Sequence, residues 1–237
     1  MGTSDFTISI RFKTDDVGSG RQQVIQQTGG NANRVIAINN GGVIASQLGS
    51  TSSESGFTAS ANTWYHVVLV HDDSENTLKW YVDGTAKNTN TSVNIGSNTG
   101  QFKLGTNSAS SDKWFDGQMD ELRIWSAALA EAQIPGDSGT DSILIGNESN
   151  LVAYYRFDDA SGTSLNDFTS NNNHGTLYNM EDSDWVASGV TLAPLDSLDD
   201  YYGRFKFYST NLSTGSVSSF SMSTSNSNYG YSGAVDG

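Results

Sequence analysis

The side chains of this chain that could do chemistry are mainly carboxylates, and their spacing does not predict an enzyme. Hydrolysis of a glycosidic bond needs two carboxylates that face each other across a cleft. Asp120 and Glu121 are adjacent, so in a strand they point to opposite faces and cannot form such a pair. The histidines at 66, 71 and 174 are scattered, and the sequence has no cysteine and no Gly-x-Ser-x-Gly motif. We therefore expect a protein without catalytic activity.

The acidic residues suit a hard cation better than they suit catalysis. Only six of the 26 acidic residues are glutamate, and several aspartates stand beside Asn or Gly. Short carboxylates in such loops can hold calcium, which takes oxygen ligands. Tight turns use the same residues, and this remains the alternative for any single aspartate. The absence of cysteine excludes a disulfide framework and a thiolate metal site.

One tryptophan is predicted to face solvent. Trp114 precedes Phe115, a candidate core residue, so strand alternation directs the indole outward. An exposed indole can stack on the C–H-rich face of a sugar while neighbouring amides and carboxylates bind its hydroxyls. The alternative is an edge-strand tryptophan that covers the rim of the fold. Of the other tryptophans, we predict that Trp64, Trp80 and Trp125 lie in the core, whereas Trp185 is ambiguous.

Short strands are the elements that must position these residues. From Phe6 to Lys13, apolar and polar residues alternate, which predicts an amphipathic strand. Trp64–His71 and Thr77–Val82 form a predicted hairpin, followed by an Asp83-Gly84 turn. Further strands are expected at Val24–Gln27, Arg34–Asn39, Val43–Leu48, Gln101–Gly105, Phe115–Trp125, Leu151–Asp158 and Gly203–Tyr208. Their even spacing favours an all-β sandwich over a βαβ arrangement.

One segment predicts a helix. Ser126 can cap the N-terminus, the following Ala-Ala-Leu-Ala-Glu-Ala stretch has high helix propensity, and Pro135-Gly136 ends it. The expected helix runs from Ser126 to Ile134.

The ordered set of these motifs resembles the laminin-G-like, concanavalin A-like jelly-roll β-sandwich of secreted bacterial proteins. The resemblance rests on the hairpin from Trp64 to Gly84, on Phe115–Leu129, and on Leu151–Asp158 with the loop Asn166–Leu177. It implies a sandwich over residues 1–190, in which residues 151–190 supply closing strands; a second, truncated domain is the alternative for that part. Residues 191–237 are expected to be a C-terminal extension, a linker or the start of a neighbouring module.

The resemblance also implies a structural calcium ion. Asp120 stands where the family has the acid of its G-x-x-D-E motif, and Asp158 follows the strand that ends the fold. Asp167 and Asn173, in the Asn-rich loop, are further candidate ligands. For Asp167, an Asx-type turn is an equal alternative.

Pentraxins are distant relatives in this resemblance, and they bind calcium and ligand between two loops. The corresponding loops here run from Gly30 to Asn33 and from Thr106 to Trp114. The candidate ligand-binding residues are Asn31, Asn33, Asn107, Asp112 and Trp114. A two-calcium site is not expected, because most of the paired acids of a pentraxin are replaced here by Asn, Ser and Thr.

Charge and composition disfavour several classes of function. A net charge of −14 and a pI near 4.3 disfavour binding to nucleic acid or to anionic lipid. No apolar stretch approaches the ~20 residues of a membrane-spanning helix. The resemblance implies a non-catalytic, lectin-like or adhesion module of a secreted or cell-surface protein, stabilised by calcium. Its expected partners are a glycan or polysaccharide and the neighbouring domains of a longer chain. A ligand-free spacer and an ancillary domain of a polysaccharide-degrading enzyme are the alternatives.

Overall fold

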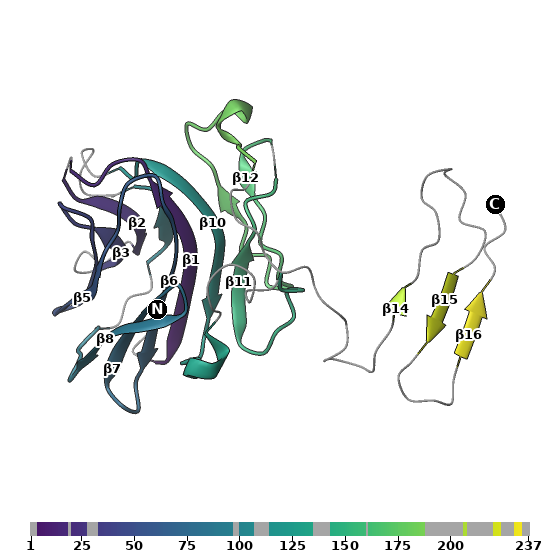
Figure 1. The fold of residues 1–237 in the computed structure, drawn as a ribbon, viewed down its shortest axis with the longest axis horizontal. Coiled ribbons are helices and arrows are strands. Elements are labelled where there is room, and N and C mark those ends of the chain that lie inside the picture. Colours follow the sequence, from purple (N-terminus) through teal and green to yellow (C-terminus); the bar gives the residue numbers. More distant parts are fainter. Residues whose placement is uncertain are drawn as a thin grey trace. The chain divides into compact units, whose positions relative to one another are not determined.

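A computed structural model describes most of the first 187 residues and three short strands near the C-terminus (Figure 1). The described residues are 4–18, 20–27, 33–96, 100–106, 114–134, 143–159, 161–187, 206–207, 220–223 and 230–233. For residues 33 and 34 and for the last three strands, only the backbone is described. The chain divides into two compact units, Met1–Leu192 and Ala193–Gly237.

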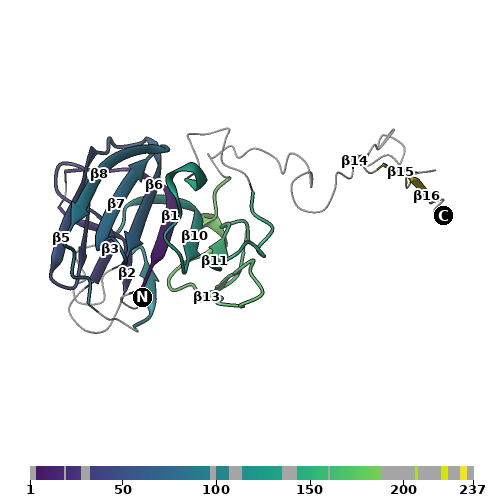
Figure 2. The ribbon, with the colours of Figure 1, turned by 90° about the horizontal axis from the view of Figure 1, so that it is seen from below.

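The first unit contains a six-stranded antiparallel sheet, called the front sheet here. Figure 2 shows its strands side by side, from β8 to β11. In spatial order they are β11 (Leu151–Tyr155), β10 (Gly117–Trp125), β1 (Phe6–Thr14), β6 (Trp64–Asp72), β7 (Thr77–Val82) and β8 (Thr85–Thr91). The predicted hairpin is therefore β6 and β7, and β11 lies at the edge of the sheet, paired with β10.

A five-stranded antiparallel sheet packs against the front sheet (Figure 1). Its strands, in spatial order, are β5 (Thr51–Thr58), β4 (Val43–Leu48), β3 (Asn33–Ile38), β2 (Gln22–Gln27) and β9 (Phe102–Leu104). The core between the two sheets follows the strand alternation: Phe6, Ile8, Ile10 and Phe12 of β1 are all buried in it. The predicted all-β sandwich is confirmed.

The predicted helix at Ser126–Ile134 is wrong. Only Glu131–Gln133 forms a short 3-10 helix, while the residues before it lie extended along the outer face of the front sheet. The Thr7 hydroxyl donates to the Ala127 carbonyl at 2.8 Å and accepts from the Leu129 N–H at 3.0 Å. Leu129 and Ile134 then cover apolar side chains of β6 and β7. Burial of these side chains outweighs the helix propensity of the alanines.

The remaining elements are short. β12 (Ser164–Leu165) pairs with β13 (Gly175–Thr176), and a 3-10 helix spans Asp182–Asp184. In the second unit, β14 (Lys206–Phe207), β15 (Phe220–Ser223) and β16 (Gly230–Gly233) form an antiparallel sheet. β14 lies within the strand expected at Gly203–Tyr208. No helix in the described part of the chain is long and apolar enough to cross a membrane.

Candidate functional site

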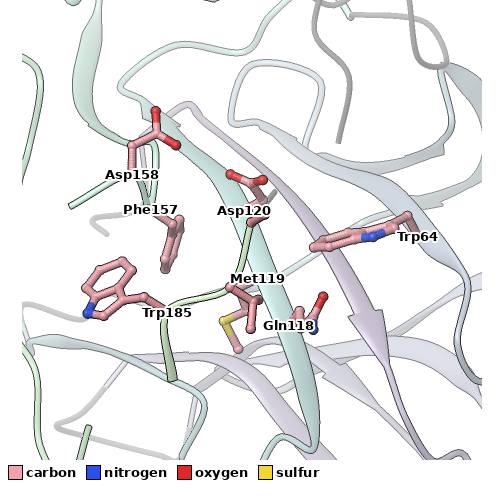
Figure 3. Close-up of a pocket in the computed structure, with 9 residues that line it drawn as sticks. Trp64, Gln118, Met119, Asp120, Phe157, Asp158 and Trp185 are labelled. Carbon is pink, nitrogen blue, oxygen red and sulfur yellow. The ribbon is translucent and has the colours of Figure 1, made fainter. Parts of the chain in front are cut away.

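A cleft of about 290 Å³ opens where β10 begins (Figure 3). It exists because β11 pairs only with the second half of β10, from Leu122 to Trp125. The first half of β10 has no neighbouring strand on that edge among the described residues, and the chain after β11 and the segment 185–187 border the gap. The lining consists of Trp64, Gln118, Met119, Asp120, Phe157, Asp158, Trp185, Val186 and Ala187.

The backbone that shapes the cleft is unusual at two points. Gly117, the first residue of β10, has a φ of +151°, and a Cβ there would lie 2.1 Å from the Lys13 carbonyl oxygen. Only glycine allows β10 to approach β1 so closely. Phe157, beside Asp158, has a φ of +56°, which a bulky residue rarely adopts. Strained backbone of this kind persists where the surrounding structure imposes it, and it is enriched at functional sites.

A bulge in β10 brings Asp120 and Glu121 to the same face of the front sheet. The single residue Ile10 of β1 lies opposite both Glu121 and Leu122, because the register shifts between Ser9 and Arg11. The prediction that Asp120 and Glu121 point to opposite faces is therefore wrong. Glu121 adopts a φ of +52° at the bulge, which a regular alternating pattern does not anticipate.

The two acidic side chains on that face are nevertheless engaged differently. Glu121 Oε2 accepts hydrogen bonds from Arg123 Nη2 and from the Tyr154 hydroxyl, both at 2.7 Å, in a buried network. Burial and the neighbouring Glu121 carboxylate raise the pKa of Tyr154. Asp120 is only 5% exposed and lines the cleft.

Asp120 and Asp158, two of the four predicted metal ligands, line this same cleft. Figure 3 shows both carboxylates along one side of it. Asp158 Oδ2 lies 2.8 Å from Arg156 Nη2, and this ion pair is partly exposed. The Arg156 guanidinium also stacks on Phe168, 4.9 Å from the ring centroid.

Two tryptophans border the cleft, on opposite sides of Met119 in Figure 3. The prediction that Trp64 lies in the core is wrong: it is partly exposed, on the outer face of β6, with Lys13 Nζ 5.9 Å from its ring centroid. Trp80 and Trp125 are buried, as predicted. Trp185, ambiguous in the sequence, is partly exposed, and its Nε1–H is buried without an acceptor among the described residues.

Asp167 and Asn173, the other two predicted metal ligands, lie together in a loop outside the cleft. The Asp167 carboxylate accepts four hydrogen bonds: from the N–H groups of Tyr154, Thr169 and Asn173, and from the Thr169 hydroxyl, at 2.8 to 3.0 Å. Burial raises the pKa of Asp167, but these hydrogen bonds together outweigh it and hold the pKa below its usual value. With its oxygens committed to protein donors, this loop has the geometry of the Asx-type alternative.

The four predicted calcium ligands lie in two places: Asp120 and Asp158 in the cleft, and Asp167 and Asn173 in the loop. In proteins, a calcium ion takes roughly 6–8 oxygen ligands. Asp120 and Asp158 supply two carboxylates to the cleft, where Asp158 also pairs with Arg156, and both oxygens of the Asp167 carboxylate accept hydrogen bonds from the protein. No cluster of three or more His, Cys, Asp or Glu side chains suited to a metal occurs in the described part of the chain. Calcium binding stays a prediction.

The predicted ligand loops fall largely outside the described residues. Asn31, Asn107 and Asp112 are not described, and Asn33 begins β3 without a described side chain. Trp114 is 56% exposed, in line with its expected outward orientation, but it does not line the cleft.

Sequence reasoning missed Trp64, Gln118 and Trp185 as site residues. A signal was present for Trp64: it precedes the core residue Tyr65, so strand alternation directs its indole outward, as it does that of Trp114. No comparable signal marks Gln118 or Trp185, because the cleft depends on where β11 stops pairing.

Comparisons with known proteins agree with the fold. A family profile described as the concanavalin A-like lectin/glucanases superfamily, of the Laminin_G_3 type, matches residues 1–135. No curated protein matches. A protein of Bacteroides ovatus ATCC 8483, provisionally assigned to carbohydrate binding, is similar in structure with a TM-score of 0.59 at 20% identity. The match covers 75% of this chain and 55% of that one, so this chain spans about half the length of that relative.

Two further solved structures are more weakly similar. The CBM40 domain of a Ruminococcus gnavus sialidase, bound to α2,3-sialyllactose, has a TM-score of 0.47 at 16% identity, with 55% of this chain and 80% of that one covered. Domain 4 of an extracellular arabinanase from Geobacillus stearothermophilus, in complex with arabinotriose, has a TM-score of 0.45 at 21% identity, with coverages of 55% and 66%. Because the family profile spans more than half of the sequence and the sandwich is the one it describes, this chain belongs to the concanavalin A-like lectin/glucanase superfamily.

Proposed function

We propose that this chain is a non-catalytic carbohydrate-binding module whose ligand lies in the cleft between Trp64 and Trp185. The observation that carries the proposal is the composition of the cleft. Two partly exposed indoles border it, and an amide and two carboxylates line it: Gln118, Asp120 and Asp158. Indole faces pack on the C–H surfaces of a sugar ring, while amide and carboxylate groups bind its hydroxyls.

The affinity of such a site is expected to be low. The cleft is open and small, so it contacts few sugar units at once. A Kd of about 1 mM corresponds to about −4 kcal/mol. Tight attachment to a polysaccharide would then come from repeated modules in a longer parent chain.

The functional setting is part of the same proposal. A role in glycan binding is consistent with the provisional assignment of the Bacteroides ovatus relative, and it suits a secreted or surface-attached protein that meets polysaccharide. Calcium stabilisation is retained as a proposal that a chelator experiment decides.

A hydrolytic role is the second candidate, since the superfamily includes glucanases and two carboxylates line one cleft. Against it, Asp158 forms an ion pair with Arg156. Incubation with plant and marine polysaccharides, followed by an assay for reducing ends, tests this candidate. We expect no release of sugar; release that disappears in Asp120→Asn would establish an enzyme.

The binding proposal is tested on a glycan and polysaccharide panel, with millimolar calcium and with chelator. Wild-type protein is compared with Trp64→Ala, Trp185→Ala and, as a matched control, Trp114→Ala, which removes an exposed indole outside the cleft. We expect binding to an uncharged sugar class, reduced at least tenfold by either cleft substitution and unchanged by the control.

Other outcomes would change the proposed site, the proposed function or the role of calcium. Loss of binding in Trp114→Ala alone would move the site to the loop that ends at Trp114. No binding by folded protein in either condition would favour the spacer function. A melting temperature that falls in chelator, with no change in glycan binding, would make calcium purely structural.

A further inference from the structure

The Arg156–Asp158 pair gives the cleft a charge arrangement that bears on ligand choice. Asp158 lines the cleft and Arg156 does not. The guanidinium has one carboxylate partner among the described residues, Asp158 at 2.8 Å, and its Nε is buried without an acceptor. The guanidinium also lies over the aromatic ring of Phe168, with its central carbon 4.9 Å from the ring centroid. Asp158 therefore neutralises an arginine that is otherwise poorly satisfied.

Two other basic residues lie next to residues that line the cleft but do not line it themselves. Lys13 contacts the Trp64 ring, and Arg11 lies opposite Asp120 in the pairing of β1 with β10. No basic side chain lines the cleft among the described residues, whereas Asp120 and Asp158 do. The charged side chains that line the cleft are thus both acidic.

A planar guanidinium binds carboxylates and sulfates strongly, often through two parallel hydrogen bonds. Arg156 would be such an anion site if Asp158 did not occupy it. We propose that Asp158 is a specificity-determining residue: by holding Arg156, it makes the cleft select uncharged glycans and reject those that carry carboxylate or sulfate groups. The inference rests on the proposed function, because it names the ligand class of the same cleft.

The test compares polymers that share a backbone and differ in charge: hydroxyethyl with carboxymethyl cellulose, and methyl-esterified with de-esterified polygalacturonan. A small-molecule pair, methyl β-D-glucoside and methyl β-D-glucuronide, is titrated in parallel by NMR. The proteins are the full chain, Asp158→Asn, and the double variant Arg156→Gln/Asp158→Asn. Asp73→Asn, on the exposed β6–β7 turn, is the control for the change in net charge.

We expect the wild-type chain to bind members of the uncharged set and to bind their acidic counterparts at least tenfold more weakly. Asp158→Asn should gain at least tenfold in affinity for the acidic probes. The gain should vanish in the double variant, and Asp73→Asn should behave as wild type. Melting temperatures confirm that each variant is folded.

Three results overturn the inference: equal binding of acidic and uncharged probes by wild type, no gain in Asp158→Asn, or a gain that survives removal of Arg156. The first of these needs no variant. If wild type binds uncharged glycans but Asp158→Asn shows no gain, the inference fails and the proposed function stands. If wild type binds no uncharged glycan, the proposed function fails and the inference with it, whatever the variants do.

Discussion

At the scale of single residues, the carboxylates of this chain fall into three roles. Asp167 holds a loop through four hydrogen bonds, Glu121 balances a buried arginine, and Asp120 and Asp158 face a cleft. The sequence shows each of them as an acid near a strand end. What separates the roles is where the fold places each carboxylate, which depends on contacts between distant segments. Such roles cannot be read from residue type and spacing alone.

Asp167→Asn tests the loop role. Asparagine keeps one acceptor oxygen, so part of the hydrogen bonding is lost, at a cost of about 2 kcal/mol at pH 7. That corresponds to a fall in Tm of about 4–8 °C for a chain of this size, measured by thermal unfolding. Asp73→Asn, on an exposed turn, should leave the Tm within about 1 °C.

The difference in stability between wild type and Asp167→Asn should depend on pH, because the pKa of Asp167 is lowered in the folded protein. A carboxyl group with a lowered folded-state pKa contributes stability that is fully present above its unfolded-state pKa of about 3.9, and this stability is lost as the pH falls through the folded-state value. The gap between wild type and Asp167→Asn should therefore narrow below about pH 4. A gap that is constant from pH 7 to pH 3 would contradict the proposed role of the carboxylate.

At the scale of elements, β10 is the strand that makes the site. Its bulge directs Asp120 and Glu121 to one face, and its first half is left without a neighbour on the β11 side. Alternation in the sequence predicted the strands, the hairpin and the sandwich, because core burial dictates the two-residue period. It predicted neither the bulge nor the loss of the helix at Ser126–Ile134. A bulge breaks the period, and packing on the front sheet overrides helix propensity.

The buried network at the bulge should be sensitive to loss of charge. Glu121→Gln preserves shape but removes the charge of the carboxylate that pairs with Arg123, which is only 1% exposed. We expect a loss of about 3 kcal/mol in the free energy of unfolding, measured in denaturant. Tyr154→Phe removes one hydrogen bond to Glu121 and keeps the ion pair, so it should cost about half as much or less. Equal losses in the two variants would argue against the ion pair as the main contribution.

The start of β10 should tolerate no side chain. In Gly117→Ala the new Cβ would lie 2.1 Å from the Lys13 carbonyl oxygen, so β1 and β10 must separate beside the cleft. Gly41→Ala is the matched control, since Gly41 also has a positive φ but has no atom within 4 Å of the built Cβ. We expect the free energy of unfolding to fall by about 1 kcal/mol in the control, because of backbone strain, and by about 3 kcal/mol in Gly117→Ala. Similar losses would mean that the close approach of the two strands is not needed.

At the scale of the whole molecule, charge and division into units both bear on function. The net charge of −14 disfavours acidic polymers generally, and the charged side chains that line the cleft among the described residues, Asp120 and Asp158, are acidic as well. The cleft draws its residues from Trp64 to Ala187, all within the unit Met1–Leu192. We therefore expect the unit Met1–Leu192 to fold and to bind the ligand without the unit Ala193–Gly237.

Truncation after Leu192 tests this division. The shortened chain should keep the Tm of the full chain within about 2 °C and its glycan affinity within about twofold. Calorimetry and the same binding assay measure both quantities. A large loss of stability would show that residues 193–237 belong to the folding unit of the sandwich.

The measurement that tests the central claim most directly is an NMR titration that follows the indole N–H signals. The chain has five tryptophans, so this region of the spectrum holds one signal for each, and Trp→Phe variants assign them. As a glycan from the panel is added, the signals of Trp64 and Trp185 should shift together along one binding curve, while those of Trp80, Trp114 and Trp125 stay in place. A curve that moves the Trp114 signal and leaves Trp64 and Trp185 unchanged would contradict the account.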